Sequence, residues 1–419
     1  MTASLWKNRT FTRLFLSYST TNIGDWMDMV ALQVLFQYVW HADPFTISLI
    51  YVMYIGPGIL FGQMAGVLAD RWKKLNLMIT ADFICVAMTL GLVFAPNPAW
   101  ALFLLLCRSM VSCFFGPSQQ ALLRNVVSKE QLLQATTLNL TVFQLAKVLG
   151  PLIGAPIVTY FSPTACLLVN AVSFLCSALI LLSVGKIPEN RPMPRPAGEK
   201  VSLRRSWLEG WAALLQKRVL LISTIIFIFG MFMVMVAESE TVVLLGDVAP
   251  ERQGLLGYVL GISGVGAVIL GVILTRQKQL TAFGWVLGGG SVLLGSGYAG
   301  MGFYHDGVPL FWLFFASLVQ GCGLMLAYLG YTYLLQVKTP QDKMGRIAGI
   351  NNSLQSGTMI TGPLAGGAMV SAFGASITFQ VMGIAIAIVG VVMIFAQKYI
   401  FDEDEDAPHT VAGDGDLSV

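Results

Sequence analysis

The sequence contains twelve apolar stretches, each about as long as the roughly 20 residues that a helix needs to cross a lipid bilayer. They fall at 11–39, 45–69, 75–95, 99–122, 131–160, 164–184, 219–246, 253–275, 281–303, 308–336, 345–373 and 376–397. Only 11% of the residues are charged, whereas a soluble domain has about 25%. Because backbone groups inside a membrane must be hydrogen-bonded within the chain, these stretches predict helices. The expected fold is therefore an all-α membrane protein with twelve transmembrane helices.

One connection is much longer than the others and divides the twelve predicted helices into two sets of six. Residues 185–218 are polar and contain four prolines, which is typical of a linker. We expect an N-terminal six-helix bundle over 1–184, a C-terminal bundle over 219–398 and an acidic cytoplasmic tail over 399–419. Residues 207–215, inside the linker, have an amphipathic pattern that predicts a short helix on the membrane surface.

The distribution of basic residues predicts how the chain is oriented in the membrane. Of the 25 lysine and arginine residues, 22 fall in segments on the same side as the two termini, and only Arg252 falls in a loop on the other side. Cytoplasmic loops are enriched in basic residues, so we expect a cell (inner) membrane protein with both termini in the cytoplasm. The basic residues are spread over many loops, which argues against nucleic-acid binding.

The two halves of the sequence repeat each other. Residues 108–154 align with residues 320–366 without gaps at a constant offset of 212, and the pattern Gly-Pro-x-x-Gly occurs in both copies. Proline removes a helix hydrogen bond, and small residues allow helices to approach closely. We therefore expect two pseudo-symmetric bundles with a kinked, closely packed gate at their interface. The expected gating residues are Gly150, Pro151, Gly154, Gly362, Pro363 and Gly366.

Seven ionisable residues lie inside predicted membrane helices, where a charge is costly and usually serves a function. Burial and a neighbouring like charge both favour the protonated form of a carboxyl group, so acids in this setting can bind protons. The candidates for proton coupling or substrate binding are Asp25, Asp28, Arg108, Lys147, Glu238 and Glu240.

Several of these residues also have a structural interpretation. Asp25 could cap the chain beside Gly24, and Glu240 could be an exposed residue at a helix end. Asp82, the seventh ionisable residue, could anchor the nearby charged loop. Lys147 could pair with Asp28 or bind an anionic substrate.

A short charged loop separates the second and third predicted helices. Residues 66–74 are Gly-Val-Leu-Ala-Asp-Arg-Trp-Lys-Lys. This segment resembles the signature loop of major facilitator superfamily transporters. The resemblance implies that the loop is a conformational latch that holds the two halves together in the outward-facing state, with Arg346 as the cation that Asp70 contacts. The latch residues are then Gly66, Asp70, Arg71, Asp82 and Arg346.

Two further segments narrow the resemblance. Residues 23–25, together with the charged loop and Asp82, resemble the macrolide-efflux and siderophore-export branch of bacterial transporters. Residues 146–155 resemble the Gly-x-x-x-Gly-Pro-x-x-Gly-Gly motif of the family's antiporters, with alanine in place of the first and last glycine. The resemblance implies a proton-coupled exporter of an amphipathic small molecule, such as a drug or a siderophore, that works by alternating access.

Two other functions stay open. One is a lipid or lysophospholipid flippase of the same fold, in which Arg108 and Lys147 bind a phosphate. The other is a non-transporting receptor or sensor whose acidic residues 402–406 bind a partner. The three histidines and six cysteines lack the spacing of a metal or catalytic site. We therefore expect a monomer in the lipid bilayer, without enzymatic activity, metal or cofactor.

Overall fold

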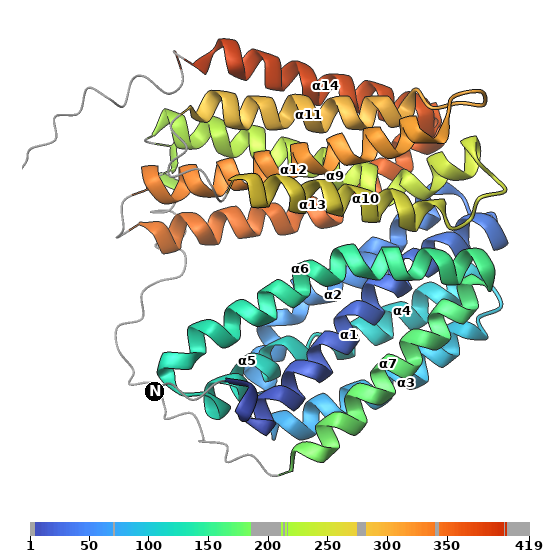
Figure 1. Ribbon diagram of the computed structural model, residues 1–419, viewed down its shortest axis with the longest axis vertical. Coiled ribbons are helices and arrows are strands. Elements are labelled where there is room, and N and C mark those ends of the chain that lie inside the picture. Colours follow the sequence, from blue (N-terminus) through green and yellow to red (C-terminus); the bar gives the residue numbers. More distant parts are fainter. Residues whose placement is uncertain are drawn as a thin grey trace, which may run out of the picture.

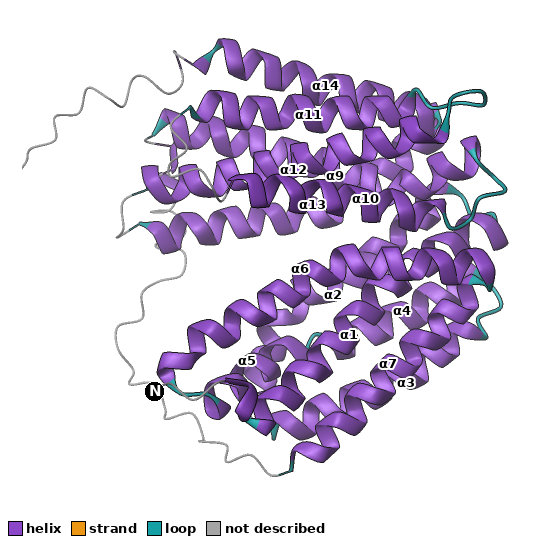
Figure 2. Cartoon of the chain, in the orientation of Figure 1, coloured by secondary structure: helices purple, strands orange, loops and turns teal. Residues whose placement is uncertain are grey.

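The computed structural model describes residues 5–69, 72–185, 211–212, 214–215, 217–274, 282–339, 343–397 and 399. Within these residues every regular element is a helix and no strand occurs (Figure 2). Nine of the helices in the described part are long and apolar enough to cross a membrane by length and composition. The acidic tail and most of the expected linker lie outside the described residues.

The N-terminal half forms six membrane segments. They are α1 (Arg9–Val34), α2 (Pro44–Ala69), α3 (Lys74–Val93), α4 (Pro98–Ser112) followed by α5 (Phe115–Val126), α6 (Lys129–Tyr160) and α7 (Pro163–Val184). A π-helical turn, Leu35–Val39, extends α1. Asn97 and Ser162 cap α4 and α7 through their side chains, and each is followed by a proline at the first helical position, where proline's missing N–H has no helical partner to lose.

The C-terminal half forms six further helices. They are α9 (Arg218–Val248), α10 (Leu255–Leu274), α11 (Phe283–Gly302), α12 (Leu310–Lys338), α13 (Met344–Phe373) and α14 (Ala375–Phe395). The expected all-α fold with twelve membrane segments is therefore confirmed. Most helix ends lie within a few residues of the predicted ones, but the segment expected as one helix over 99–122 is broken between α4 and α5.

The two halves lie side by side and are inclined to each other (Figure 1). Their helices meet at the end drawn on the right of Figure 1 and diverge toward the end where the N-terminus lies. At the closed end, Gly257, Gly261 and Gly264 of α10 lie against α6 over 148–155 so closely that a Cβ at any of them would overlap that helix. Gly367 of α13 lies equally close to the start of α2. At Gly257 and Gly367 the atoms that a Cβ would meet include backbone of the facing helix, so the two helices approach each other directly there.

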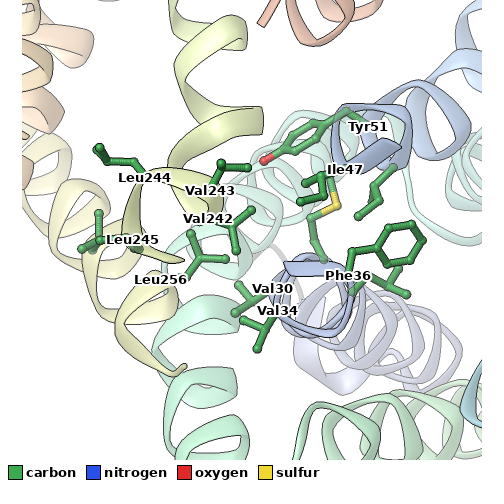
Figure 3. Close-up of a cluster of buried hydrophobic side chains, with 14 of the residues drawn as sticks. Val30, Val34, Phe36, Ile47, Tyr51, Val242, Val243, Leu244, Leu245 and Leu256 are labelled. Carbon is green, nitrogen blue, oxygen red and sulfur yellow. The ribbon is translucent and has the colours of Figure 1, made fainter. Parts of the chain in front are cut away.

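Apolar side chains from both halves seal this closed end. Val30 and Val34 of α1 and Ile47 of α2 belong to the same buried cluster as Val242 of α9 and Leu256 of α10 (Figure 3). Tyr51 points into the same region and is the polar member of the group (Figure 3). Direct packing of helices from the two halves therefore joins them at this end.

The two Gly-Pro elements occupy equivalent places in the two halves. A Cβ at Gly150 would overlap Trp26 of α1, and a Cβ at Gly362 would overlap Met235 of α9. The glycines thus hold α6 against α1 and α13 against α9, within each half. The carbonyl oxygen of Pro151 in turn faces Gly257 of the other half, so the first element also reaches the interface. Their expected gating role stays a prediction.

Candidate functional site

The N-terminal half contains a buried ion pair between α1 and α4. Arg108 Nη2 donates to Asp28 Oδ2, and the two side chains are only 2% and 0% exposed. Arg108 Nη1 donates to Thr89 Oγ1 of α3 at 3.2 Å, and the guanidinium carbon lies 5.8 Å from the ring centroid of Tyr54 of α2. One guanidinium therefore joins four helices. Because both charges are out of water, removal of either one would leave the other unpaired in a low dielectric.

A second carboxylate shares this cation. Asp25 lies one helical turn before Asp28, within electrostatic range of Arg108, and beside Asn170 of α7. Asp28 Oδ1 is buried and has no hydrogen-bond partner among the described residues. Two carboxylates facing one guanidinium carry one surplus negative charge unless a proton is bound. The structure thus brings Asp25, Asp28 and Arg108 together, and their expected role in proton coupling or substrate binding stays a prediction.

A separate polar contact links α3, α7 and α1 inside the same half. Asp82 is 1% exposed, and its Oδ2 accepts a hydrogen bond from Ser177 Oγ of α7. The Ser177 hydroxyl is also 2.7 Å from the Ser17 hydroxyl of α1. Asp82 therefore ties three helices together in the interior of the N-terminal half.

The expected latch falls largely outside the described residues. Asp70 and Arg71 are outside them, and the surroundings of Gly66 are also not described. Arg346 lies exposed near the start of α13. The contact between Asp70 and Arg346 therefore stays a prediction.

Lys147 does not join the ion pair of the N-terminal half. Its side chain is exposed on α6, and its Nζ lies 5.3 Å from the ring centroid of Trp26 and 5.1 Å from that of Phe143. Asp28, the partner that the sequence suggested, is bound to Arg108. Glu238 of α9 lies within electrostatic range of Lys147, so Lys147 faces the C-terminal half.

The two acids of α9 lie in different surroundings. Glu240 is 0% exposed, which excludes the exposed helix end considered from the sequence. Its Oε1 accepts from Ser239 Oγ at 3.2 Å, and its Oε2 has no partner among the described residues. Glu238 is half-buried, and its backbone carbonyl accepts from the Tyr51 hydroxyl at 3.1 Å. That hydrogen bond crosses from one half to the other at the closed end.

The sequence analysis missed a neutral polar group in the C-terminal half. Gln320 of α12 is 5% exposed, its Nε2 donates to the Tyr298 hydroxyl of α11 at 3.0 Å, and its Oε1 accepts from Ser263 of α10. Gln320 is the residue that the internal repeat aligns with Arg108. The alignment was a usable signal, but a search restricted to ionisable residues does not consider a glutamine.

The described residues offer no site for a metal ion. They contain no group of three or more histidine, cysteine, aspartate or glutamate side chains arranged to hold one. The six cysteines are free thiols.

Comparison with known proteins identifies a family and several relatives of this chain. The sequence model of the Major Facilitator Superfamily matches residues 14–360. The chain is 26% identical to YfiS of Bacillus subtilis (strain 168), an uncharacterized MFS-type transporter, over 92% of each chain. It is also 24% identical to the enterobactin exporter EntS of Escherichia coli O157:H7, over 86% of this chain and 85% of that protein.

A solved structure supports the fold. The structure of a bacterial homolog to the human lysosomal transporter Spinster, in an inward-facing and unoccupied conformation, matches with a TM-score of 0.69. The match covers 94% of this chain and 98% of that one at 14% identity, so it is a likeness of fold. The match of the family model over most of the chain goes further, and it confirms the resemblance found in the sequence. This multi-pass membrane protein belongs to the Major Facilitator Superfamily, a family of transporters rather than enzymes.

Proposed function

We propose that the protein is a proton-coupled antiporter that exports an amphipathic small molecule. The observation that carries this proposal is the group of two carboxylates, Asp25 and Asp28, around the single guanidinium of Arg108. Without a bound proton the group has a net negative charge. With one proton on Asp25 it is a neutral acid beside a complete ion pair, which lowers the cost of keeping the group buried inside the membrane.

The orientation of the chain in the membrane and the way the two halves diverge support the proposed direction of transport. Almost all described lysines and arginines in loops lie at the end of the molecule that holds the N-terminus, and Arg252 lies at the other end. The positive-inside rule then supports cytoplasmic termini in the cell membrane. In that orientation the halves diverge toward the cytoplasm and are sealed on the outer side. An exporter takes up its substrate in such a state, before the halves rock about the centre. The likeness to an enterobactin exporter supports the same direction.

The test is transport by the purified protein in proteoliposomes with an imposed pH gradient. The panel contains a cationic dye, a macrolide, a siderophore and a lysophospholipid. We expect Asp25→Asn and Asp28→Asn each to abolish uptake that depends on the pH gradient, because one carboxylate and one guanidinium then remain and the group is neutral without a bound proton. Asp306→Asn, which changes an exposed acid in an outer loop, is the matched control and should transport normally.

Three outcomes would contradict the proposal. Normal gradient-driven uptake by both aspartate variants would remove the proposed proton site. Movement of the lysophospholipid without any response to the pH gradient would indicate a flippase. Binding of a panel member with no flux under any gradient would indicate a receptor or sensor.

A further inference from the structure

Lys147 is a basic residue inside a membrane helix that the proposed proton site does not use. It lies near the middle of α6, it is exposed, and no carboxylate among the described residues lies within ion-pair distance of it. Its ammonium group instead lies over two aromatic rings, those of Trp26 and Phe143. The two rings are 6.5 Å apart at an interplanar angle of 70°. A lysine in such surroundings keeps its three N–H donors available to a ligand, because a ring face accepts no conventional hydrogen bond.

The backbone holds this arrangement in place. Gly150 of α6 lies directly against Trp26 Cβ and the backbone of Met27, which sets the position of the Trp26 ring on α1 relative to α6. Phe143 precedes Lys147 by four residues, so the two side chains share one face of α6. The cation and both rings are therefore positioned by helix packing rather than by a mobile loop.

The group faces the other half of the protein. Val148, the next residue, packs against Gly264 of α10, and Glu238 of α9 is within electrostatic range of Lys147. A lysine exposed to lipid near the middle of a membrane would be costly, and its direction toward the C-terminal half avoids that cost. It also places the ammonium group where a molecule held between the two halves would contact it.

The internal repeat shows that the fold itself does not need this cation. The positions that align with Phe143 and Lys147 in the C-terminal half are Gln355 and Met359. A membrane-embedded charge kept for structure is normally paired, as Arg108 is with Asp28. Lys147 has neither a structural counterpart nor a carboxylate partner in the described part of the chain, which points to a ligand.

We propose that Lys147, Trp26 and Phe143 form a subsite for an aromatic amphipathic anion, with the anionic group on the Lys147 ammonium and the ring of the ligand against Trp26. The choice of anion as the transported class rests on the proposed export function. Glu238 competes with the ligand for Lys147, because its carboxylate is within electrostatic range of the same ammonium group.

The test is equilibrium binding to the purified full-length protein by a scintillation proximity assay. The probes are a radiolabelled naphthyl-alkyl carboxylate and its matched trimethylammonium analogue. We expect the wild type to prefer the carboxylate. Lys147→Met should weaken carboxylate binding about 10- to 100-fold, the loss expected for one charge-assisted hydrogen bond. Lys147→Arg should keep most of the affinity. Glu238→Gln should strengthen carboxylate binding, because it removes the competing charge.

Met359→Ala, at the aligned position of the other half, is the matched control, and each variant is checked by thermal unfolding and gel filtration. Equal affinity of the wild type for the two probes, or unchanged carboxylate binding by Lys147→Met, would overturn the subsite. Carboxylate binding that is weaker in Glu238→Gln than in the wild type would contradict the proposed competition between Glu238 and the ligand. The binding assay needs no gradient, so the two proposals can fail separately. Selective binding of the carboxylate without proton-driven flux would refute only the export function. Proton-driven flux that is unchanged in Lys147→Met would refute only the subsite.

Discussion

The two halves of the protein share one architecture but differ in the charge at their centres. In the N-terminal half, Arg108 is bonded to Asp28 and Thr89. In the C-terminal half, the aligned Gln320 is bonded to Tyr298 and Ser263. Both side chains are almost completely buried, and both connect their helix to neighbouring ones.

The difference shows that this fold does not require a charged centre. An amide and two hydroxyl groups join the helices of the C-terminal half at the same place where an ion pair joins those of the other half. Neutral groups avoid the desolvation cost of a buried ion pair, so such a pair is weak support for stability. The presence of an ion pair at Arg108, where the aligned position of the other half holds a neutral glutamine, therefore favours a functional role for Asp28 and Arg108.

The largest expected loss of stability comes from replacing Arg108 by glutamine, the residue at the aligned position 320 of the C-terminal half. Arg108→Gln leaves the buried Asp28 carboxylate without a cation, and we expect the free energy of unfolding to fall by about 3–5 kcal/mol. Denaturant unfolding of the purified protein in detergent measures the loss. Arg108→Gln combined with Asp28→Asn should recover most of the stability, since two neutral amides replace the ion pair. A double variant as unstable as the single one would show that the pair is needed for the fold.

The second prediction concerns the Gly-Pro elements, which both halves contain. Gly150→Ala and Gly362→Ala each place a methyl group against a neighbouring helix, and we expect each to cost about 1–3 kcal/mol through overpacking. The same unfolding measurement applies. Gly357→Ala on α13 has nothing within 4 Å of the new methyl group and should be neutral or stabilising. A loss confined to one of the two Gly-Pro elements would contradict their structural equivalence.

A smaller loss of stability is expected for the hydrogen-bonded group around Gln320 in the C-terminal half. Gln320→Leu leaves the hydroxyl groups of Tyr298 and Ser263 without this partner, and we expect a loss of about 1–2 kcal/mol. If the charged group of the N-terminal half alone couples transport to protons, Gln320→Leu should not change the pH dependence of transport. A shifted pH profile in Gln320→Leu, measured in the proteoliposome assay, would show that the C-terminal centre takes part in proton exchange.

The smallest effect concerns the loops at the end where the two halves meet. Asp43 caps the start of α2 by accepting from Thr46 N at 3.0 Å and from the Thr46 hydroxyl, and this hydrogen bonding lowers the pKa of Asp43. In the other half, α10 begins just after Gly254, which has no capping side chain. Asp43→Ala should cost about 0.5–1 kcal/mol at neutral pH, a typical value for an N-cap.

The pH dependence of this cap has a definite sign. A carboxyl group whose pKa is lower in the folded state stabilises the fold above its unfolded pKa, and the contribution disappears as the pH falls through the folded value. The difference in unfolding temperature between wild type and Asp43→Ala should therefore be constant near neutral pH and shrink in acid. A difference that grows in acid would show that Thr46 does not stabilise the charged form.

Much of the architecture was determined by the sequence alone. The length and apolarity of the twelve stretches predict membrane helices because a lipid environment leaves the backbone few alternatives. The offset between the Gly-Pro elements predicts the twofold plan, and the structure places Gly150 and Gly362 in equivalent contacts. The rarity of charge inside these helices also singled out Asp25, Asp28 and Arg108 before any geometry was known.

The partners of those charges were decided only by the tertiary structure. Spacing along one helix shows which side chains share a face, but it does not show which face of another helix lies opposite. The sequence therefore suggested Lys147 as a partner of Asp28, whereas the packing of the helices placed Arg108 against that carboxylate and Lys147 over two aromatic rings. The same limit hid the contact of Gln320 with Tyr298, because the energy of a buried polar group depends on neighbours that come from distant parts of the chain.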